Sequence, residues 1–102
     1  MITKEQVKAF GAIETPFYFY DMDLLRRTLE VYQAQIDQYG YNAHYALKAN
    51  ANDRILQVIK AHGLGADCVS GNEVKLSVRS GFDPSFQSHL HWLSHANPKY
   101  YP

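Results

Sequence analysis

The sequence predicts an α/β fold in which short parallel strands alternate with amphipathic helices. Short apolar or aromatic segments at residues 15–20, 43–48 and 66–69 are each followed by a stretch with helical apolar spacing. Alternation of this kind, with short connections, is typical of parallel β/α units. So few units do not close a sheet. The chain is therefore either a small open α/β layer or the first part of a longer fold, such as a barrel of eight β/α units.

The first predicted unit begins with the aromatic segment at residues 15–20, which we expect to form a short strand. Asp21 and Asp23 are suitable N-caps for the helix that follows, and Gly40 is well placed to end it. The apolar stripe expected on this helix consists of Leu25, Leu29, Tyr32 and Ile36. These signals together predict a long amphipathic helix between Asp21 and Gly40.

The second predicted unit starts with the mostly apolar segment at residues 43–48, which predicts a buried strand ending at Lys48. Asn50 or Asn52 can cap the next helix, and glycines 63 and 65 can end it. The apolar stripe of this helix consists of Ile55, Leu56 and Ile59.

The third predicted unit has its strand at residues 66–69. Ser70 and Glu73 then match the S-x-x-E capping box, which marks a helix N-terminus. We expect that helix to run to Gly81. Its apolar residues are Val74 and Val78.

The pattern changes after Pro84. Another strand would continue the alternation at this point, but residues 85–102 contain no clear strand, and three of the five histidines lie among them. We therefore expect residues 1–84 to form the N-terminal part of a β/α domain, and residues 85–102 to form a separate, poorly specified tail.

Composition excludes several classes of function. The ten basic and ten acidic residues cancel, so no basic surface favours nucleic acid and no acidic tail favours a binding arm. The longest apolar runs are far shorter than a membrane span, and the N-terminus lacks the apolar region of a signal peptide. The single cysteine, Cys68, cannot form an internal disulfide. We therefore expect a cytoplasmic protein without membrane or nucleic-acid partners.

Lys48 is the main candidate for a catalytic residue. Sites in parallel β/α proteins form at the carboxyl ends of the strands, and alternation places Lys48 on the same face as His44 and Ala46. Apolar surroundings favour the neutral amine of a lysine, which is the nucleophile that forms a Schiff base with an aldehyde cofactor. On this pattern alone, an ordinary solvated lysine is the commoner interpretation.

Asp67 is the second candidate, because it lies at or near the strand that follows Lys48. A carboxylate near an ammonium stabilises the charged form and fixes its position, although a loop aspartate bound to backbone amides fits the pattern equally well. Glu73 could face the same site, but its place in the capping box already explains it. Cys68 has no basic neighbour in sequence, which favours a small buried residue over a nucleophile.

The histidines of the tail are weak candidates for metal ligands. His91 and His95 would share a face if the tail were helical, as zinc ligands can. No carboxylate or cysteine accompanies them or His89, and their flanks do not define a helix. We therefore expect no metal site.

Several segments match one known family in order and spacing. They are TPFYFYD at residues 15–21, YALKAN at 45–50, GADCVSGNE at 65–73 and SGFDP at 80–84. Together they resemble the start of the TIM-type (β/α)8 barrel of the diaminopimelate decarboxylases. These belong to the fold-type III pyridoxal-phosphate decarboxylases, which also include ornithine and arginine decarboxylases.

The resemblance implies that Lys48 is the catalytic lysine that holds pyridoxal 5′-phosphate as a Schiff base, and that Asp67 is the acidic residue beside it at the cofactor. Ser70 and Glu73 match the family's stretch after the second strand, where capping remains our interpretation. The implied reaction is α-decarboxylation of meso-2,6-diaminopimelate to L-lysine and carbon dioxide, a step of lysine biosynthesis. The substrate is then a small amino acid, and the family is homodimeric.

Members of this family differ from this chain in length. They are several times longer, and they carry the phosphate loop, the other cofactor contacts and a second β domain later in the sequence. We therefore expect an N-terminal fragment that does not decarboxylate by itself, its tail the product of a frameshift or truncation. The alternatives are a cofactor-binding module without decarboxylase activity, a fragment of an ornithine- or arginine-type decarboxylase, and a small interaction protein built on an open α/β layer.

Overall fold

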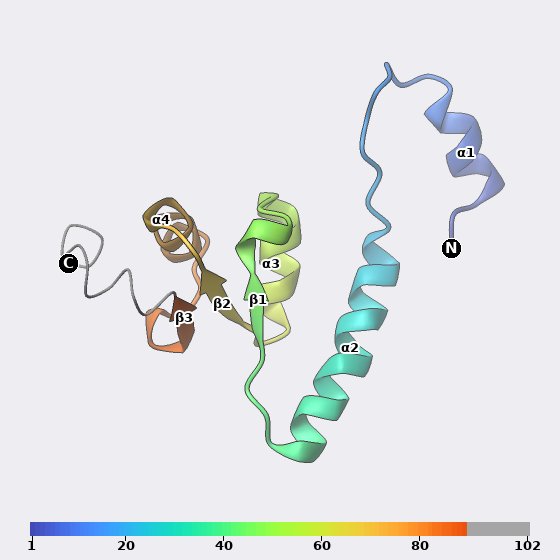
Figure 1. Ribbon diagram of the computed structural model, residues 1–102. Helices are drawn as coiled ribbons and strands as arrows, with labels where there is room; N and C mark the ends of the chain where they lie inside the picture. The colour runs from blue at the N-terminus through green and yellow to red at the C-terminus, as the bar shows by residue number, and fades with distance from the viewer. Residues whose placement is uncertain (90–102) are drawn as a thin grey trace.

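The computed structural model describes residues 1–89, and Figure 1 shows the order of its elements along the chain. The helices are α1 (Lys4–Phe10), α2 (Met22–Tyr39), α3 (Asp53–Ala61) and α4 (Gly71–Arg79), with short 3-10 turns η1 (Leu47–Ala49) and η2 (Pro84–Phe86). The strands are β1 (His44–Ala46), β2 (Gly65–Cys68) and β3 (Gln87–His89). Helix α3 connects β1 to β2, and α4 connects β2 to β3.

The three strands form one sheet in the order β1-β2-β3, and both pairs are parallel. In this register Asp67 of β2 has Ala46 of β1 as its Cα partner on one side and Ser88 of β3 on the other. The alternation of parallel strands and helices predicted from the sequence is therefore confirmed. The three strands form the start of a β/α fold, and β3 is an edge strand whose outer side pairs with no strand of residues 1–89.

The two faces of the sheet are covered differently. On β2, Ala66 and Cys68 are fully buried, while Asp67 between them is half-buried. Because successive side chains of a strand point to opposite faces, Ala66 and Cys68 face the helices and Asp67 points to the other side. On β1, Tyr45 packs against the core and His44 is exposed. The face that carries His44 and Asp67 is thus the less covered one.

The core lies between the sheet and its two connecting helices. Buried side chains of α3 pack against buried residues of β2 and of the turn after β1, as the predicted stripe of this helix requires. The residues of this core are Leu29, Leu47, Ile55, Leu56, Ile59, Leu64, Ala66, Cys68 and Phe82. Most of them come from residues 47–82, so the β/α units bury more apolar surface than the N-terminal third does.

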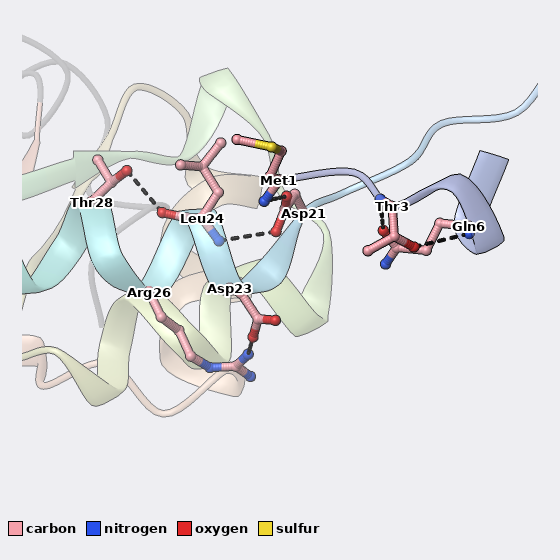
Figure 2. Close-up of polar contacts among 8 residues, drawn as sticks. All are labelled: Met1, Thr3, Gln6, Asp21, Asp23, Leu24, Arg26 and Thr28. Atoms are coloured by element: carbon pink, nitrogen blue, oxygen red, sulfur yellow. Dashed lines mark hydrogen bonds and ion pairs between the residues drawn. The ribbon is translucent and has the colours of Figure 1, made fainter.

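Helix α2 begins and ends where the sequence predicts. Oδ1 of Asp21 accepts the N–H of Leu24 at 3.0 Å, and Oδ2 lies 3.2 Å from the ammonium group of Met1 (Figure 2). These contacts satisfy a backbone donor of the first turn and place negative charge at the helix N-terminus. Gly40 ends the helix in the left-handed conformation, with φ of 67°, which glycine adopts without steric cost.

Most of the surface of α2 is exposed, and one residue of its predicted apolar stripe lies on the solvent side. Leu29 is buried in the core and Leu25 packs against it, whereas Tyr32 remains 51% exposed. Figure 1 shows α2 beside β1 and α3 rather than on top of the sheet. A helix in that place buries a narrow stripe, which explains why Tyr32 stays outside.

The N-terminal segment corrects one expectation. Residues 15–20 form no strand; the aromatic rings at 17 and 19 instead pack on Phe10, with ring centroids 5.5 and 4.9 Å away. Phe10 belongs to α1, a seven-residue helix that precedes the expected strand. A capping box opens α1: Thr3 accepts the N–H of Gln6, and the Gln6 side chain accepts the N–H of Thr3 (Figure 2). Among residues 1–89, no strand pairs with this β-prone segment.

Two details of the connecting helices also differ from expectation. Gly63, with φ of 79°, follows the end of α3, whereas Gly65 is the first residue of β2. On α4 the fully buried residue is Ser77, while Val78 is 50% exposed. The Ser77 hydroxyl donates to the carbonyl oxygen of Val74 within its own helix, which satisfies it in the core.

The expectation that no strand follows Pro84 is wrong. Strand β3 (Gln87–His89) pairs in parallel with β2 and continues the alternation. A strand of three residues is too short to show a pattern of alternation in the sequence. Its hydrogen bonds with β2, rather than its local sequence, stabilise it as a strand. Residues 90–102, which make up most of the predicted tail, lie outside the described part of the chain.

Candidate functional site

Lys48 lies in the 3-10 turn η1, directly after β1, at the carboxyl end of the parallel sheet. The strand stops at Ala46, so the expectation that it runs on to Lys48, and that alternation sets the lysine's direction, is wrong. The apolar surroundings expected for Lys48 are also absent, because its side chain is exposed. Within residues 1–89, no hydrogen bond or ion pair holds its ammonium group. The amine is therefore accessible to a ligand.

Buried neighbours fix the turn that carries Lys48. Leu47 is 1% exposed and anchors the turn in the core, while Ala49 on the other side is small and exposed. The turn η1 also contacts β2. A lysine between a buried leucine and a short alanine has its backbone held and its amine in solvent, which suits a residue that receives a bulky ligand.

Asp67 lies on the strand next to the lysine turn. It is the Cα partner of Ala46, two residues before Lys48. Its side chain is half-buried on the face of the sheet opposite the helices. The structure therefore places Asp67 on β2 and Lys48 in the turn directly after the adjacent strand β1, at the end of the sheet where ligands bind in parallel β/α proteins.

Ser70 and Glu73 have the structural role assigned to them. The Ser70 hydroxyl accepts the backbone N–H of Glu73 at 3.2 Å. One carboxylate oxygen of Glu73 accepts the N–H of Val69 at 2.8 Å and the Ser70 hydroxyl proton at 3.3 Å. The glutamate reaches one residue further back than the usual capping box. Its interaction with the helix N-terminus explains its presence without a catalytic role.

Cys68 is a buried residue, as expected. Its side chain is 1% exposed, and burial raises the pKa of its thiol above the ordinary value of 9.0, although a hydrogen bond with Ser77 opposes this change. Less thiolate is therefore present at neutral pH than in an exposed cysteine. Cys68 packs the sheet against α4.

The described residues add little to the other predicted classes of site. No helix within residues 1–89 is long and apolar enough to cross a membrane. No three histidine, cysteine or carboxylate residues gather into a possible metal site in that part of the chain. His91 and His95 lie outside the described residues, and nothing is shown of the side chain of His89.

Sequence reasoning missed the polar residues that surround the lysine turn. Tyr45 donates from its hydroxyl to the carbonyl oxygen of Asn50, and the Asn50 amide donates to the hydroxyl of Tyr20. Of the two asparagines that could cap α3, Asn52 is the N-cap and accepts the N–H of Arg54. The two asparagines spaced by one residue were the available signal, because asparagine often binds the backbone two residues on.

The comparisons with known proteins agree with this geometry. The sequence model described as "Pyridoxal-dependent decarboxylase, pyridoxal binding domain" matches residues 22–88. Diaminopimelate decarboxylase from Bacteroides thetaiotaomicron is 47% identical over 77 residues, which are 74% of this chain and 20% of that protein. The probable chloroplastic diaminopimelate decarboxylase from Oryza sativa is 44% identical over 78 residues, 76% of this chain and 16% of that protein.

A solved structure shows the same relationship. Diaminopimelate decarboxylase from Helicobacter pylori, crystallised as a mutant in complex with L-lysine, superposes with a TM-score of 0.68 and 31% sequence identity, over 81% of this chain and 21% of that one. The chain thus spans between 16% and 21% of the length of these relatives. The family match runs from the start of α2 into β3 and includes both Lys48 and Asp67. This chain belongs to the family of pyridoxal-dependent decarboxylases, and residues 22–88 match the family's pyridoxal-binding domain.

Proposed function

We propose that this chain carries the cofactor-attaching lysine of a diaminopimelate decarboxylase, and that Lys48 is that lysine. The observation that carries the proposal is the place of Lys48 directly after β1, at the carboxyl end of a parallel sheet, inside the segment that matches the family. Of the six lysines in the chain, Lys60 and Lys75 belong to helices α3 and α4, and Lys4 and Lys8 to α1. Lys99 lies outside the described residues.

The residues around Lys48 fit pyridoxal 5′-phosphate. The amine is exposed and unpaired within residues 1–89, and Ala46 and Ala49 leave space beside it. When bound, the cofactor supplies an aldehyde to the lysine and an electron-accepting ring to the substrate. The contribution of Lys48 is a nucleophilic nitrogen, and its ammonium must lose a proton before the lone pair is available.

Asp67 is proposed as the acidic residue at the same site. Its strand lies next to the lysine turn, and its carboxylate belongs to the face that the helices leave open. A carboxylate in that place attracts the ammonium of the lysine or a positively charged group of a ligand. Asp67 thereby orients its partner rather than forming a bond with it.

The proposed substrate is meso-2,6-diaminopimelate, which loses one carboxyl group as carbon dioxide and gains a proton to become L-lysine. Relatives named diaminopimelate decarboxylase, at 47% and 44% identity, support this choice over ornithine or arginine. A small amino-acid substrate also agrees with the L-lysine in the related crystal structure. We further propose a cytoplasmic location and, for the working decarboxylase, a homodimer as in the family.

The isolated 102-residue chain is proposed to bind cofactor weakly and to release no measurable carbon dioxide. The described sheet has three strands, and on the face that carries Asp67 the side chain of His44 is exposed. An open site leaves water next to the reacting groups and weakens the electrostatic interactions on which catalysis depends.

The proposal is tested by mapping where the cofactor attaches. The chain is incubated with pyridoxal 5′-phosphate and reduced with borohydride, and each lysine-containing peptide is quantified by mass spectrometry. We expect Lys48 to be labelled more than Lys60 and Lys75 at low cofactor concentration. Equal labelling of all the lysines would contradict the proposal. Carbon-dioxide release by the chain from carboxyl-labelled diaminopimelate would contradict the expected lack of turnover.

A further inference from the structure

We infer that Asn50 and Tyr45 are positioning residues for Lys48, because they hold the turn from which the lysine is presented. The inference rests on the proposed role of Lys48. It assigns neither residue a contact with the cofactor, since both act through the backbone of residues 46–49. The observation behind it is a set of three hydrogen bonds, all made by Asn50, that close around this turn.

The first hydrogen bond closes the turn itself. The hydroxyl of Tyr45, within β1, donates to the backbone carbonyl oxygen of Asn50 at 2.8 Å, and this bond is partly buried. It joins residues five positions apart, so residues 46–49 lie inside the ring that it closes. Lys48 is in that ring. A partly buried hydrogen bond is stronger electrostatically than one in water.

The side chain of Asn50 ties the same turn to two other elements. Its Oδ1 accepts the backbone N–H of Asn52 at 2.9 Å, and Asn52 is the N-cap of α3. Its Nδ2 donates to the hydroxyl of Tyr20 at 3.2 Å, and Tyr20 lies just before α2. One asparagine therefore connects the lysine turn to the starts of both neighbouring helices.

The hydrogen-bonded loop of residues 46–49 is held by the Tyr45 hydroxyl, which stays protonated, and by the buried side chain of Leu47. Burial raises the pKa of the Tyr45 hydroxyl above its ordinary value of 10.0, so the hydroxyl keeps its proton at neutral pH and continues to donate. Leu47 is 1% exposed and holds the middle of the turn in the core. Lys48 lies between Leu47 and the hydrogen-bonded carbonyl group of Asn50, and its side chain is exposed. A reactive group on a backbone held in this way samples fewer directions, which favours attack in one geometry.

Three variants separate the hydrogen bonds. Tyr45→Phe removes the hydrogen bond to the Asn50 carbonyl oxygen and keeps the aromatic ring of residue 45. Asn50→Ala removes both side-chain bonds but keeps that carbonyl. Asn50→Asp keeps an oxygen to accept the N–H of Asn52 and is the conservative variant. Two matched controls have no hydrogen bond from the substituted side chain within residues 1–89: Tyr32→Phe on α2 and Asn72→Ala on α4.

Two measurements on the 102-residue chain test the inference. The first is the ratio of borohydride-reduced pyridoxal label on Lys48 to that on Lys60, together with the induced circular dichroism of the bound chromophore before reduction. The second is hydrogen exchange of residues 45–52 without cofactor. We expect Tyr45→Phe and Asn50→Ala to lower the ratio about two- to tenfold, as the loss of one hydrogen bond allows. They should also weaken the dichroism and speed exchange in this segment.

The outcomes distinguish the inference from the proposed function. Partial recovery of the ratio in Asn50→Asp, with both controls at the wild-type value, would support positioning. An unchanged ratio and dichroism in Tyr45→Phe and Asn50→Ala, with faster exchange, would overturn the inference while Lys48 remained the attachment site. If Lys48 of the wild-type chain took no more label than Lys60, the proposed function would fail, and the inference with it, whatever the exchange showed.

Discussion

Asp67 and Ala46 are Cα partners across the parallel ladder between β2 and β1. This register brings Asp67 beside the strand end from which Lys48 follows two residues later. The two neighbours of Asp67 on β2, Ala66 and Cys68, point to the opposite face of the sheet, where they are fully buried against the helices. The four-residue strand β2 thus contributes core residues on one face of the sheet and a candidate site residue on the other.

Substitution of the buried residue Ala66 should test the packed face of β2. We expect Ala66→Leu to lower the free energy of unfolding by about 1–3 kcal/mol, because extra methylenes do not fit a packed core. Ala34→Leu is the matched control, because Ala34 lies on the exposed surface of α2, and it should change the free energy of unfolding by less than about 0.5 kcal/mol. Urea unfolding followed by circular dichroism measures both. Equal losses would show that Ala66 does not lie in a packed core.

The cap of α4 gives a second prediction. Ser70→Ala removes the acceptor for the N–H of Glu73, and we expect a loss of about 1 kcal/mol in the free energy of unfolding. Ser80→Ala is the matched control, because the Ser80 hydroxyl forms no hydrogen bond within residues 1–89. Thermal and urea unfolding of the two variants should differ accordingly. A control as unstable as Ser70→Ala would show that the cap is not the cause.

Asp21 should make the stability of α2 depend on acid pH. The hydrogen bond from the N–H of Leu24 and the contact with the Met1 ammonium lower the pKa of Asp21 below its ordinary value of 3.8. A carboxyl group with a lower pKa in the folded state stabilises the fold above its unfolded pKa, and this contribution is lost as pH falls through the folded pKa. The difference in unfolding free energy between wild type and Asp21→Asn should therefore shrink below about pH 4. A constant difference between pH 3 and 6 would contradict this assignment.

Cys68 should be unreactive while the chain is folded. Its thiol is buried and its pKa is raised, so we expect iodoacetamide to alkylate the native chain at least about tenfold more slowly than the chain in urea. Mass spectrometry of quenched samples gives both rates. A native rate equal to the rate in urea would show that the thiol is exposed.

The raised pKa of Cys68 also predicts a loss of stability at alkaline pH. The unfolded thiol loses its proton first, near its ordinary value of 9.0. Above that pH the unfolded chain binds fewer protons than the folded chain, so the free energy of unfolding decreases as pH rises. Cys68→Ala should show a smaller decrease than wild type between about pH 8 and 10. The same decrease in both would assign the effect to other groups, such as Tyr45.

The order of the β/α units could be predicted from the sequence because its signals are local. The caps at Asp21 and Ser70, the stop at Gly40 and the stripe on α3 each depend on residues within a few positions of one another, and all are found in the structure. The short strand β3 could not be predicted in this way, since its three residues are a strand only by pairing with β2.

The details of the site were less predictable than the fold. The periodicity of residues 43–48 indicated a strand through Lys48, yet the chain turns at Leu47 because that side chain is buried in the core. The hydrogen bonds of Asn50 join segments up to 30 residues apart. Contacts over such distances have no signature in local spacing. The lysine itself was found by resemblance, since its pattern alone matched an ordinary surface residue.

The central claim is that Lys48 is the residue to which the cofactor attaches. The most direct measurement is the intact mass of Lys48→Ala and Lys75→Ala after incubation with a low concentration of pyridoxal 5′-phosphate and borohydride reduction. Lys75 is the matched control because it is an exposed lysine within α4, outside the turn η1 that follows β1. We predict that Lys75→Ala takes up label like wild type and that Lys48→Ala loses most of it. Equal labelling of both variants would contradict the account.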